Sequence, residues 1–141
     1  MPRCLSPGDH SDPSDTERLE LTAWVKAIAK LCHDAGIVLG ARIFPTEAQN
    51  DESGYAVREW MASGLLDYVT PMFYSYFVLD PDMPQEWVVE AAAGTDCSVY
   101  GFLQAYINQA EALHPTSEQM RAAASNFWAN GVDGLYSYFA Q

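Results

Sequence analysis

The first regular pattern of hydrophobic residues in the chain has the spacing of an amphipathic helix. It follows Ser14 and Glu17, whose separation fits a capping box, and it stops at Gly36, a residue type common at helix ends. The sequence therefore predicts a helix between these limits. The hydrophobic positions that form the pattern are Leu19, Leu21, Trp24, Val25, Ile28 and Leu31.

A continuous hydrophobic run with the length of a buried strand comes next. It reads "IVLGARIFP", and it ends at Pro45 because proline has no amide hydrogen to give to a sheet. The same order, a helix that ends in glycine and then a strand, occurs three more times. The later pairs are "YAVREWMASG" with "LLDYVTPMFY", "PQEWVVEAAAG" with "CSVYGFLQAY", and "TSEQMRAAASNFWANG" with "VDGLYSYF", the last helix opening on a capping box at Thr116 and Gln119.

Alternating helices and strands, with strands that are hydrophobic on both faces, predict an α/β fold in which helices cover a parallel sheet. Two architectures compete, an open doubly wound sheet and part of a (β/α)8 barrel. No glycine motif of the type G-x-G-x-x-G or G-x-x-x-x-G-K-[ST] follows a predicted strand, which favours the barrel. We expect a flexible leader over residues 1–15 and a half-barrel domain of four helix–strand units with parallel strands over residues 16–141.

A half barrel has two open sheet edges, which invite pairing with another strand. We therefore expect a homodimer or a higher even oligomer that completes the sheet; the alternative is a partly open sheet with helices rearranged over its edge. Arg42 would point toward the inner face of the barrel, or else reach water from an edge strand. The small or polar residues expected on the inner face are Gly40, Arg42, Thr70, Tyr74 and Gly101.

Charge and cysteine content narrow the range of partners. The formal net charge is −12, and such an excess of acids repels phosphate backbones and anionic lipids, which argues against nucleic-acid and membrane partners. Cys4, Cys32 and Cys97 are widely spaced and predict free thiols. The printed chain has no segment typical of a signal peptide or a membrane span, so we expect it to be cytoplasmic as expressed.

Polar and aromatic residues gather after the predicted strands, where parallel α/β folds place their functional groups. Aromatic rings stack on the C–H face of a sugar while amides and carboxylates bond its hydroxyls, so this mixture predicts a saccharide ligand. Glycosidic cleavage requires two carboxylates, and the candidate catalytic residues are Glu47, Asp80 and Asp82. The candidate substrate-binding residues are Arg42, Tyr74, Tyr76, Gln104, Tyr106, Tyr136 and Tyr138.

Several candidates also have a structural interpretation. Asp82 precedes a predicted helix and could cap it, and Glu47 could be a solvated loop carboxylate. Tyr136 and Tyr138 could fill the core or a dimer interface. No cofactor motif and no metal-binding pattern is evident, so we predict neither a cofactor nor a metal.

The chain resembles a known protein family over residues 17–139. The motifs that carry the resemblance are "RIFPT", "DYVTPMFY", "LDPDMP" and "GVDGLY", which fall in this order at matching positions of the predicted elements. They are similar to the C-terminal half of bacterial glycoside-hydrolase-like (β/α)8 barrel proteins. The resemblance implies a barrel, a saccharide-type substrate and a site at the carboxyl ends of the strands. In the large retaining-glycosidase clan a glutamate ends the corresponding strand, where this chain has Gln104, and an amide cannot act as that nucleophile.

These observations lead to one expected function and two open alternatives. The expected function is a carbohydrate-active, glycosidase-like hydrolase that acts at the carboxyl ends of the barrel strands. The first alternative is a saccharide-binding or assembly module that does not cleave its ligand. The second is a truncated barrel fragment with incidental hydrolytic activity, for example on esters.

Overall fold

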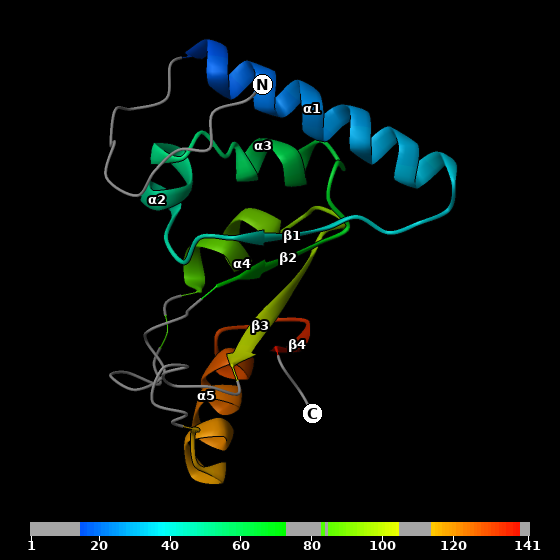
Figure 1. Cartoon of the computed structure of the whole chain (residues 1–141). Helices are drawn as coiled ribbons and strands as arrows, with labels where there is room; N and C mark the ends of the chain where they lie inside the picture. The colour runs from blue at the N-terminus through cyan, green and yellow to red at the C-terminus, as the bar shows by residue number, and fades with distance from the viewer. Residues whose placement is uncertain (1–14, 73–82, 84, 105–113, 139–141) are drawn as a thin grey trace.

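A computed structural model describes residues 15–72, 83, 85–104 and 114–138. Helices and strands alternate in this part of the chain, as the sequence predicts, and one additional short helix follows the first strand (Figure 1). The elements are α1 (Asp15–Asp34), β1 (Gly40–Ile43), α2 (Glu47–Glu52), α3 (Val57–Ala62), β2 (Tyr68–Pro71), α4 (Glu86–Ala92), β3 (Ser98–Gln104), α5 (Ser117–Ala129) and β4 (Gly134–Tyr138).

The four strands form a parallel sheet in the order β1-β2-β3-β4, so each strand pairs with the next one in sequence. A doubly wound sheet reverses its strand order at one point, and this sheet does not. Right-handed connections that all advance in one direction place their helices on one face. The predicted α/β class with parallel strands is therefore confirmed. Within the described residues, β1 and β4 each pair with a single strand, and barrel closure and dimerisation stay predictions.

The hydrophobic core lies between the sheet and its helices. Ile43, Val69 and Val99 supply the strand side of this core, and Met61 and Phe127 belong to the helices that cover it; all five are essentially buried. Successive side chains along a strand point to opposite faces. Residues at even positions of β1, β2 and β3, such as Arg42, consequently lie on the face away from this core.

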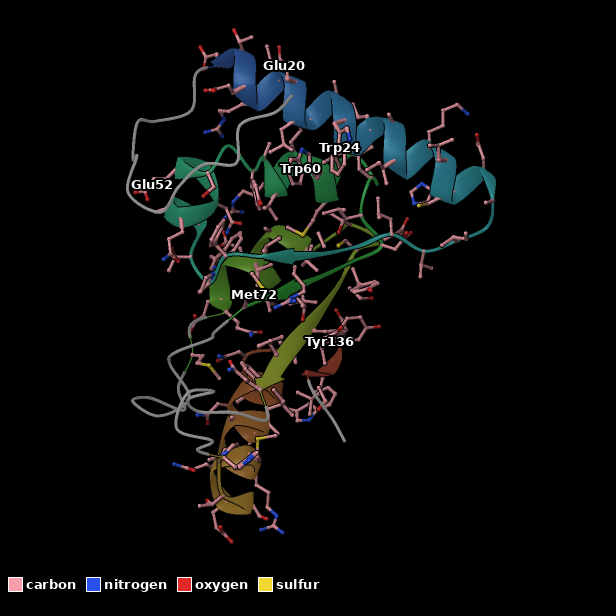
Figure 2. The ribbon with its side chains drawn as sticks, in the orientation of Figure 1. Glu20, Trp24, Glu52, Trp60, Met72 and Tyr136 are labelled. Atoms are coloured by element: carbon pink, nitrogen blue, oxygen red, sulfur yellow. The ribbon has the colours of Figure 1, made fainter. Side chains whose placement is uncertain are left out.

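Helix α1 contacts the rest of the fold through small residues. Its buried positions are Thr22, Val25 and Ala29, whereas Trp24 is 62% and Leu31 71% exposed. Figure 2 labels Trp24 on α1. The hydrophobic spacing correctly predicts the helix but not the side that packs. That side is set by a buried hydrogen bond, in which the Trp60 indole N–H of α3 donates to the Thr22 hydroxyl over 3.0 Å.

The first strand is shorter than the hydrophobic run that predicts it. Ile37 and Val38 precede β1 and are 58% and 69% exposed. The strand takes its pairing from β2, whose first residue, Tyr68, lies opposite Gly40. Residues before Leu39 have no strand beside them in the described structure, so their hydrophobic side chains do not enter the core.

At the amino end of the sheet, two aspartates form hydrogen bonds with the backbone of the neighbouring strand. Asp67 precedes β2, and its carboxylate accepts the backbone N–H of Leu39 at 2.5 Å, while its own N–H donates to the Leu39 carbonyl at 2.8 Å. Asp133 precedes β4 and makes the same two bonds with Val99, both at 2.8 Å. The Leu39 N–H, and with it the His33 ring 3.0 Å away, lowers the pKa of Asp67 below its usual value.

We expect Asp67→Asn to reduce the free energy of unfolding at pH 7 by about 1 kcal/mol, the value of a charge-assisted hydrogen bond at a partly exposed site. Because the pKa of Asp67 is lower in the folded state, this contribution is complete above the unfolded pKa of about 4 and is lost as the pH falls through the folded pKa. Urea unfolding at pH 7 and at about pH 3 should show the gap between wild type and variant closing in acid. An equal gap at both pH values would contradict this role, and the exposed Asp96→Asn is the control.

The described cysteines are free thiols, as predicted. Cys32 is half-buried and Cys97 is buried. Burial, with the nearby charges of Asp67 and Asp133, raises the pKa of the Cys97 thiol to about 11, so this thiol is protonated and unreactive at neutral pH.

Candidate functional site

Three side chains from three strands form a continuous layer on the sheet face away from the α3–α5 core. The Arg42 guanidinium of β1 lies over the Phe102 ring of β3, with its Cζ atom 5.5 Å from the ring centroid. The Phe102 ring stacks on Tyr136 of β4, with centroids 6.2 Å apart and planes 10° apart. We call Arg42, Phe102 and Tyr136 the aromatic strip. Phe102 is fully buried, whereas Arg42 and Tyr136 are exposed, so the two ends of the strip are accessible. Figure 2 labels Tyr136.

Two tyrosines occupy the same face on the amino-terminal side of the strip. Their rings, from Tyr68 and Tyr100, lie 5.5 Å apart in an edge-on arrangement. A Cβ atom at Gly40 would meet the Tyr68 ring at 1.9 Å, and one at Gly134 would meet the Tyr100 ring at 2.5 Å. Glycine at these two positions therefore leaves room for the rings, which close the amino-terminal half of this face.

Gly101 does not belong to this face, which corrects the sequence-based expectation. A Cβ atom on Gly101 would meet the Phe127 ring of α5 at 2.6 Å, so Gly101 faces the helices. The reason is the alternation along β3, which puts Tyr100 and Phe102 on the face of the strip. The expectation holds for Gly40, Arg42 and Thr70.

Buried polar groups complete the carboxyl-terminal side of the strip. Thr70 is fully buried, and its hydroxyl donates to the Tyr100 carbonyl over 2.8 Å. Gln104 ends β3 on the strip face and is 3% exposed. Its side-chain oxygen Oε1 has no hydrogen-bond partner among the described residues. The exposed guanidinium of Arg42 and phenol of Tyr136 therefore lie on the same face as the buried amide oxygen of Gln104, which can accept a further hydrogen bond.

Glu47 is held at the start of α2 by a capping box that the sequence analysis does not identify. The Gln49 backbone N–H donates to the Thr46 hydroxyl over 3.3 Å, and the Gln49 side-chain oxygen accepts the Thr46 backbone N–H. Buried Asn50 closes the turn, because its amide bonds both backbone groups of Phe44 and the Thr46 carbonyl. These bonds turn the loop after β1 into a helix whose first residue is Glu47.

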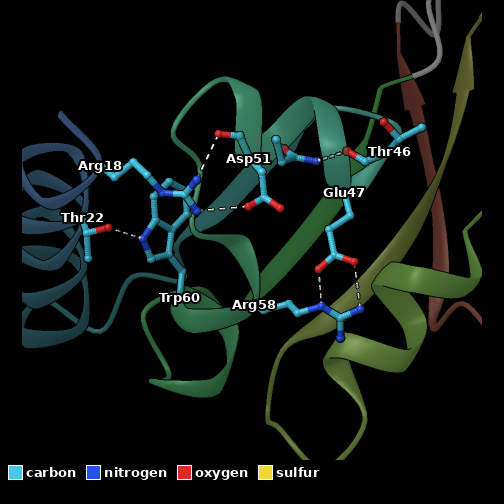
Figure 3. A network of polar contacts seen from close by, with 8 residues as sticks. Arg18, Thr22, Thr46, Glu47, Asp51, Arg58 and Trp60 are labelled. Atoms are coloured by element: carbon cyan, nitrogen blue, oxygen red, sulfur yellow. Dashed lines mark hydrogen bonds and ion pairs between the residues drawn. The ribbon is translucent and has the colours of Figure 1, made fainter. Parts of the chain in front are cut away.

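The Glu47 carboxylate is engaged by one arginine. Both of its oxygens accept from Arg58 of α3, Oε1 from Nε and Oε2 from the terminal Nη2 at 3.1 Å (Figure 3). The hydrogen bond from Arg58 lowers the pKa of Glu47, so the group is a carboxylate at neutral pH. A carboxylate in this state can act as a base or nucleophile but holds no proton to donate. The structure therefore does not favour Glu47 as the general acid.

Glu47 lines a cleft that is separate from the aromatic strip. The cleft has a volume of about 210 Å³ and lies among α1, α2, α3 and the start of α4. Its second ion pair joins Arg18 to Asp51 at 3.1 Å (Figure 3). The cleft is lined by Arg18, Glu47, Asn50, Asp51, Tyr55, Ala56, Val57, Arg58, Glu59 and Trp87. No strip residue is among them: Arg42 belongs to β1, whereas Glu47 begins α2 beyond the carboxyl end of that strand.

The remaining sequence-based candidates divide into two groups. Tyr138 belongs to β4, where its backbone pairs with Gln104, and its side chain is not described. Asp80, Asp82, Tyr74, Tyr76 and Tyr106 lie outside the described residues and stay predictions. The sequence analysis does not identify Phe102, which contacts Arg42 and Tyr136, or Arg58, which binds Glu47. Phe102 could have been found from its alternation with Gln104 along β3, whereas no local pattern relates Arg58 to Glu47.

The described part of the chain contains neither a candidate metal site nor a membrane-spanning helix. It contains no cluster of three or more histidine, cysteine, aspartate or glutamate side chains that could hold a metal ion. None of its helices is both long enough and hydrophobic enough to span a membrane.

Comparison with known proteins adds no assignment. No protein-family model and no curated protein matches the chain.

Proposed function

We propose that this chain is a carbohydrate-active protein of the glycoside-hydrolase type, which binds its saccharide at the carboxyl-terminal end of the aromatic strip. The observation that carries the proposal is the strip itself, in which Arg42, Phe102 and Tyr136 from three strands meet next to the buried amide of Gln104. The residues come from separate strands, so the fold and not local sequence brings them together.

Each part of the strip suits a different feature of a sugar. Tyr136 is 36% exposed and offers a ring face for the C–H groups of a pyranose, while buried Phe102 supports that ring from behind. A guanidinium donates up to five hydrogen bonds, and an amide oxygen accepts them, so Arg42 and Gln104 together match hydroxyl groups that both donate and accept. This pairing of a flat ring with polar groups of both kinds is the basis for choosing a saccharide.

For cleavage of a saccharide that extends from the strip to the cleft after β1, we propose Glu47 as the carboxylate that activates water or attacks the sugar. Asp80 or Asp82 is the proposed acid that protonates the leaving oxygen. The low pKa of Glu47 supports the carboxylate role, and the two bonds from Arg58 would fix its orientation. A second candidate function, saccharide binding without cleavage, is favoured by the same ion pair, because Arg58 occupies both Glu47 oxygens.

The variant Glu47→Gln distinguishes saccharide hydrolysis from saccharide binding without cleavage. If the chain is a hydrolase, we expect this variant to lose about a thousandfold in turnover of aryl glycosides, a typical loss for an acid–base group. The matched control is Asp51→Asn, which removes the other carboxylate paired with arginine in the same cleft and should leave turnover unchanged.

The outcomes are distinct for each function. Retained turnover in Glu47→Gln would exclude its catalytic role. Saccharide binding by the wild type without turnover on any glycoside would establish the binding module instead. Hydrolysis of aryl esters alone, with no saccharide bound, would contradict the proposal as a whole.

We also propose that two copies pair through the open edges of the sheet. Exposed hydrophobic side chains occur near both edges, with Trp24 and Leu31 on α1, Val38 before β1, and Trp128 at 53% and Leu135 at 36% exposure on α5 and β4. Hydrophobic side chains beside an unpaired strand are typical of surfaces that another chain covers.

Light scattering after size exclusion should then give twice the 15.6 kDa mass of the chain. Trp24→Glu should shift the protein to a monomer, because a charge would be buried in the contact. Leu19→Glu is the control, since Leu19 is also exposed but lies on another side of α1. A folded wild-type monomer at concentrations of tens of micromolar would contradict pairing.

A further inference from the structure

One buried glutamine outside the aromatic strip has an unsatisfied side chain. The buried polar residues of the described structure are Thr22, Asn50, Thr70, Gln85 and Gln104. The first three make the hydrogen bonds described above. Gln85 is fully buried, yet neither its side-chain oxygen nor its side-chain nitrogen has a partner within the part of the chain that the structure describes. Its backbone carbonyl accepts the N–H groups of Val88 and Val89.

Gln85 lies at the same edge of the sheet as Gln104. It immediately precedes α4, and Trp87, two residues later, donates its indole N–H to the Pro45 carbonyl over 2.8 Å. Pro45 follows the carboxyl end of β1, and Gln104 is the carboxyl-terminal residue of β3. Both glutamines are therefore found where the strands end, whereas the remaining buried amide atom without a partner among the described residues, Asn130 Nδ2, lies at the end of α5.

An unsatisfied amide at this position needs a physical explanation. Its close sequence neighbours Met83 and Val88 are buried hydrophobic residues, so Gln85 lies in a buried segment of the chain. A buried amide without partners destabilises the folded state, and native proteins satisfy nearly all such groups with protein, water or ligand. A primary amide supplies one acceptor and two donors and carries no charge, which matches the hydroxyl groups of a neutral sugar.

We propose that Gln85 is a ligand-binding residue that, with Gln104, hydrogen-bonds hydroxyl groups of a neutral saccharide at the carboxyl edge of the sheet. This inference rests on the proposed function and adds a residue and a substrate class to it. Gln85 is a binding residue and not part of the acid–base pair. The ligand then satisfies the amide that the free protein leaves without partners.

The test is Gln85→Met, which keeps the size and burial of the side chain and removes its polar atoms. Two quantities are measured on the full chain: the urea midpoint of unfolding without ligand, and the affinity for neutral trisaccharides (cellotriose, xylotriose and maltotriose) by calorimetry. We expect an unchanged or higher midpoint and an affinity about tenfold lower or weaker still, since losing a buried ligand hydrogen bond typically costs this factor.

Asn50→Leu is the matched control. Asn50 is a buried amide whose bonds to Phe44 and Thr46 are all made, so replacing it should lower the midpoint clearly. If Gln85→Met lowers the midpoint as Asn50→Leu does, the Gln85 amide has a structural partner such as an ordered water, and the inference is wrong. If Gln85→Met keeps both midpoint and affinity, the inference is wrong while the proposed function stands. If the wild type binds none of the three saccharides, both fall together.

Discussion

Gly101→Val is expected to destabilise the protein by about 3 kcal/mol, at the upper end of what overpacking a core costs. A Cβ atom at this position would meet Cδ2 and Cγ of Phe127 at 2.6 Å and its Cβ at 2.9 Å. Phe127 is fully buried, and Cβ and Cγ are close to the α5 backbone, so a rotation of the ring cannot relieve the clash. Either α5 must move away from β3 or the strand must bend.

Urea unfolding measures this effect, and two variants control it. Gly64→Ala changes a glycine with a φ of +64° and no atom within 4 Å of the new Cβ, so it should cost only about 1 kcal/mol from backbone conformation. Adding Phe127→Leu to Gly101→Val should recover part of the lost stability by making space. If Gly101→Val is no less stable than Gly64→Ala, the packing of α5 against β3 is not as described.

Phe102→Ala is the second large effect, with an expected loss of about 4 kcal/mol, because truncating a fully buried phenylalanine removes hydrophobic contacts and leaves a cavity. Phe102→Leu keeps most of the side-chain volume and should cost only about 1 kcal/mol. It still removes the ring that lies between the Arg42 guanidinium and Tyr136.

The leucine variant therefore tests the aromatic strip separately from the core. We expect it to remain folded by circular dichroism and to lose saccharide affinity, since Tyr136 no longer has a ring behind it. Val99→Leu, on the opposite face of the same strand, is the packing control and should retain affinity. Unchanged binding in Phe102→Leu would show that the strip does not position the ligand.

The sequence predicts the order and type of the elements well because hydrophobic spacing is a local property. The four helix–strand units and the parallel sheet follow from it, and the capping box at Thr116 follows from the residue types at positions 116 and 119. The pattern does not reveal which face of α1 packs, because the deciding contact, between Thr22 and Trp60, joins residues far apart in the chain. It also misplaces Gly101, whose alternation with Tyr100 and Phe102 along β3 puts it on the helix-facing side of the sheet.

The candidate site is predictable in part. Arg42, Gln104 and Tyr136 are chosen from the sequence as residues near strand ends, and the structure places them on one face. Glu47 is chosen on the same grounds, but its surroundings are set by Arg58, eleven positions later, and by the capping box that turns the loop into α2. Position along a strand can be inferred locally, whereas ion pairing requires the tertiary arrangement.

The hydrogen bonds of Asp67 and Asp133 strengthen two of the three strand pairs of the described sheet and leave the third without such a bond. β1 pairs with β2 over four positions, and β3 pairs with β4 over five. Asp67 adds a carboxylate hydrogen bond to the first of these pairs, and Asp133 adds one to the second. β2 pairs with β3 over only two positions. Figure 1 shows β3 diverging from β2 along its length. Local opening of the sheet should therefore begin between β2 and β3, where the Thr70–Tyr100 hydrogen bond is the side-chain link that must break. Arg42 and Phe102 lie on opposite sides of this boundary, so the aromatic strip can widen or narrow while the hydrogen bonds within the β1–β2 and β3–β4 pairs stay intact.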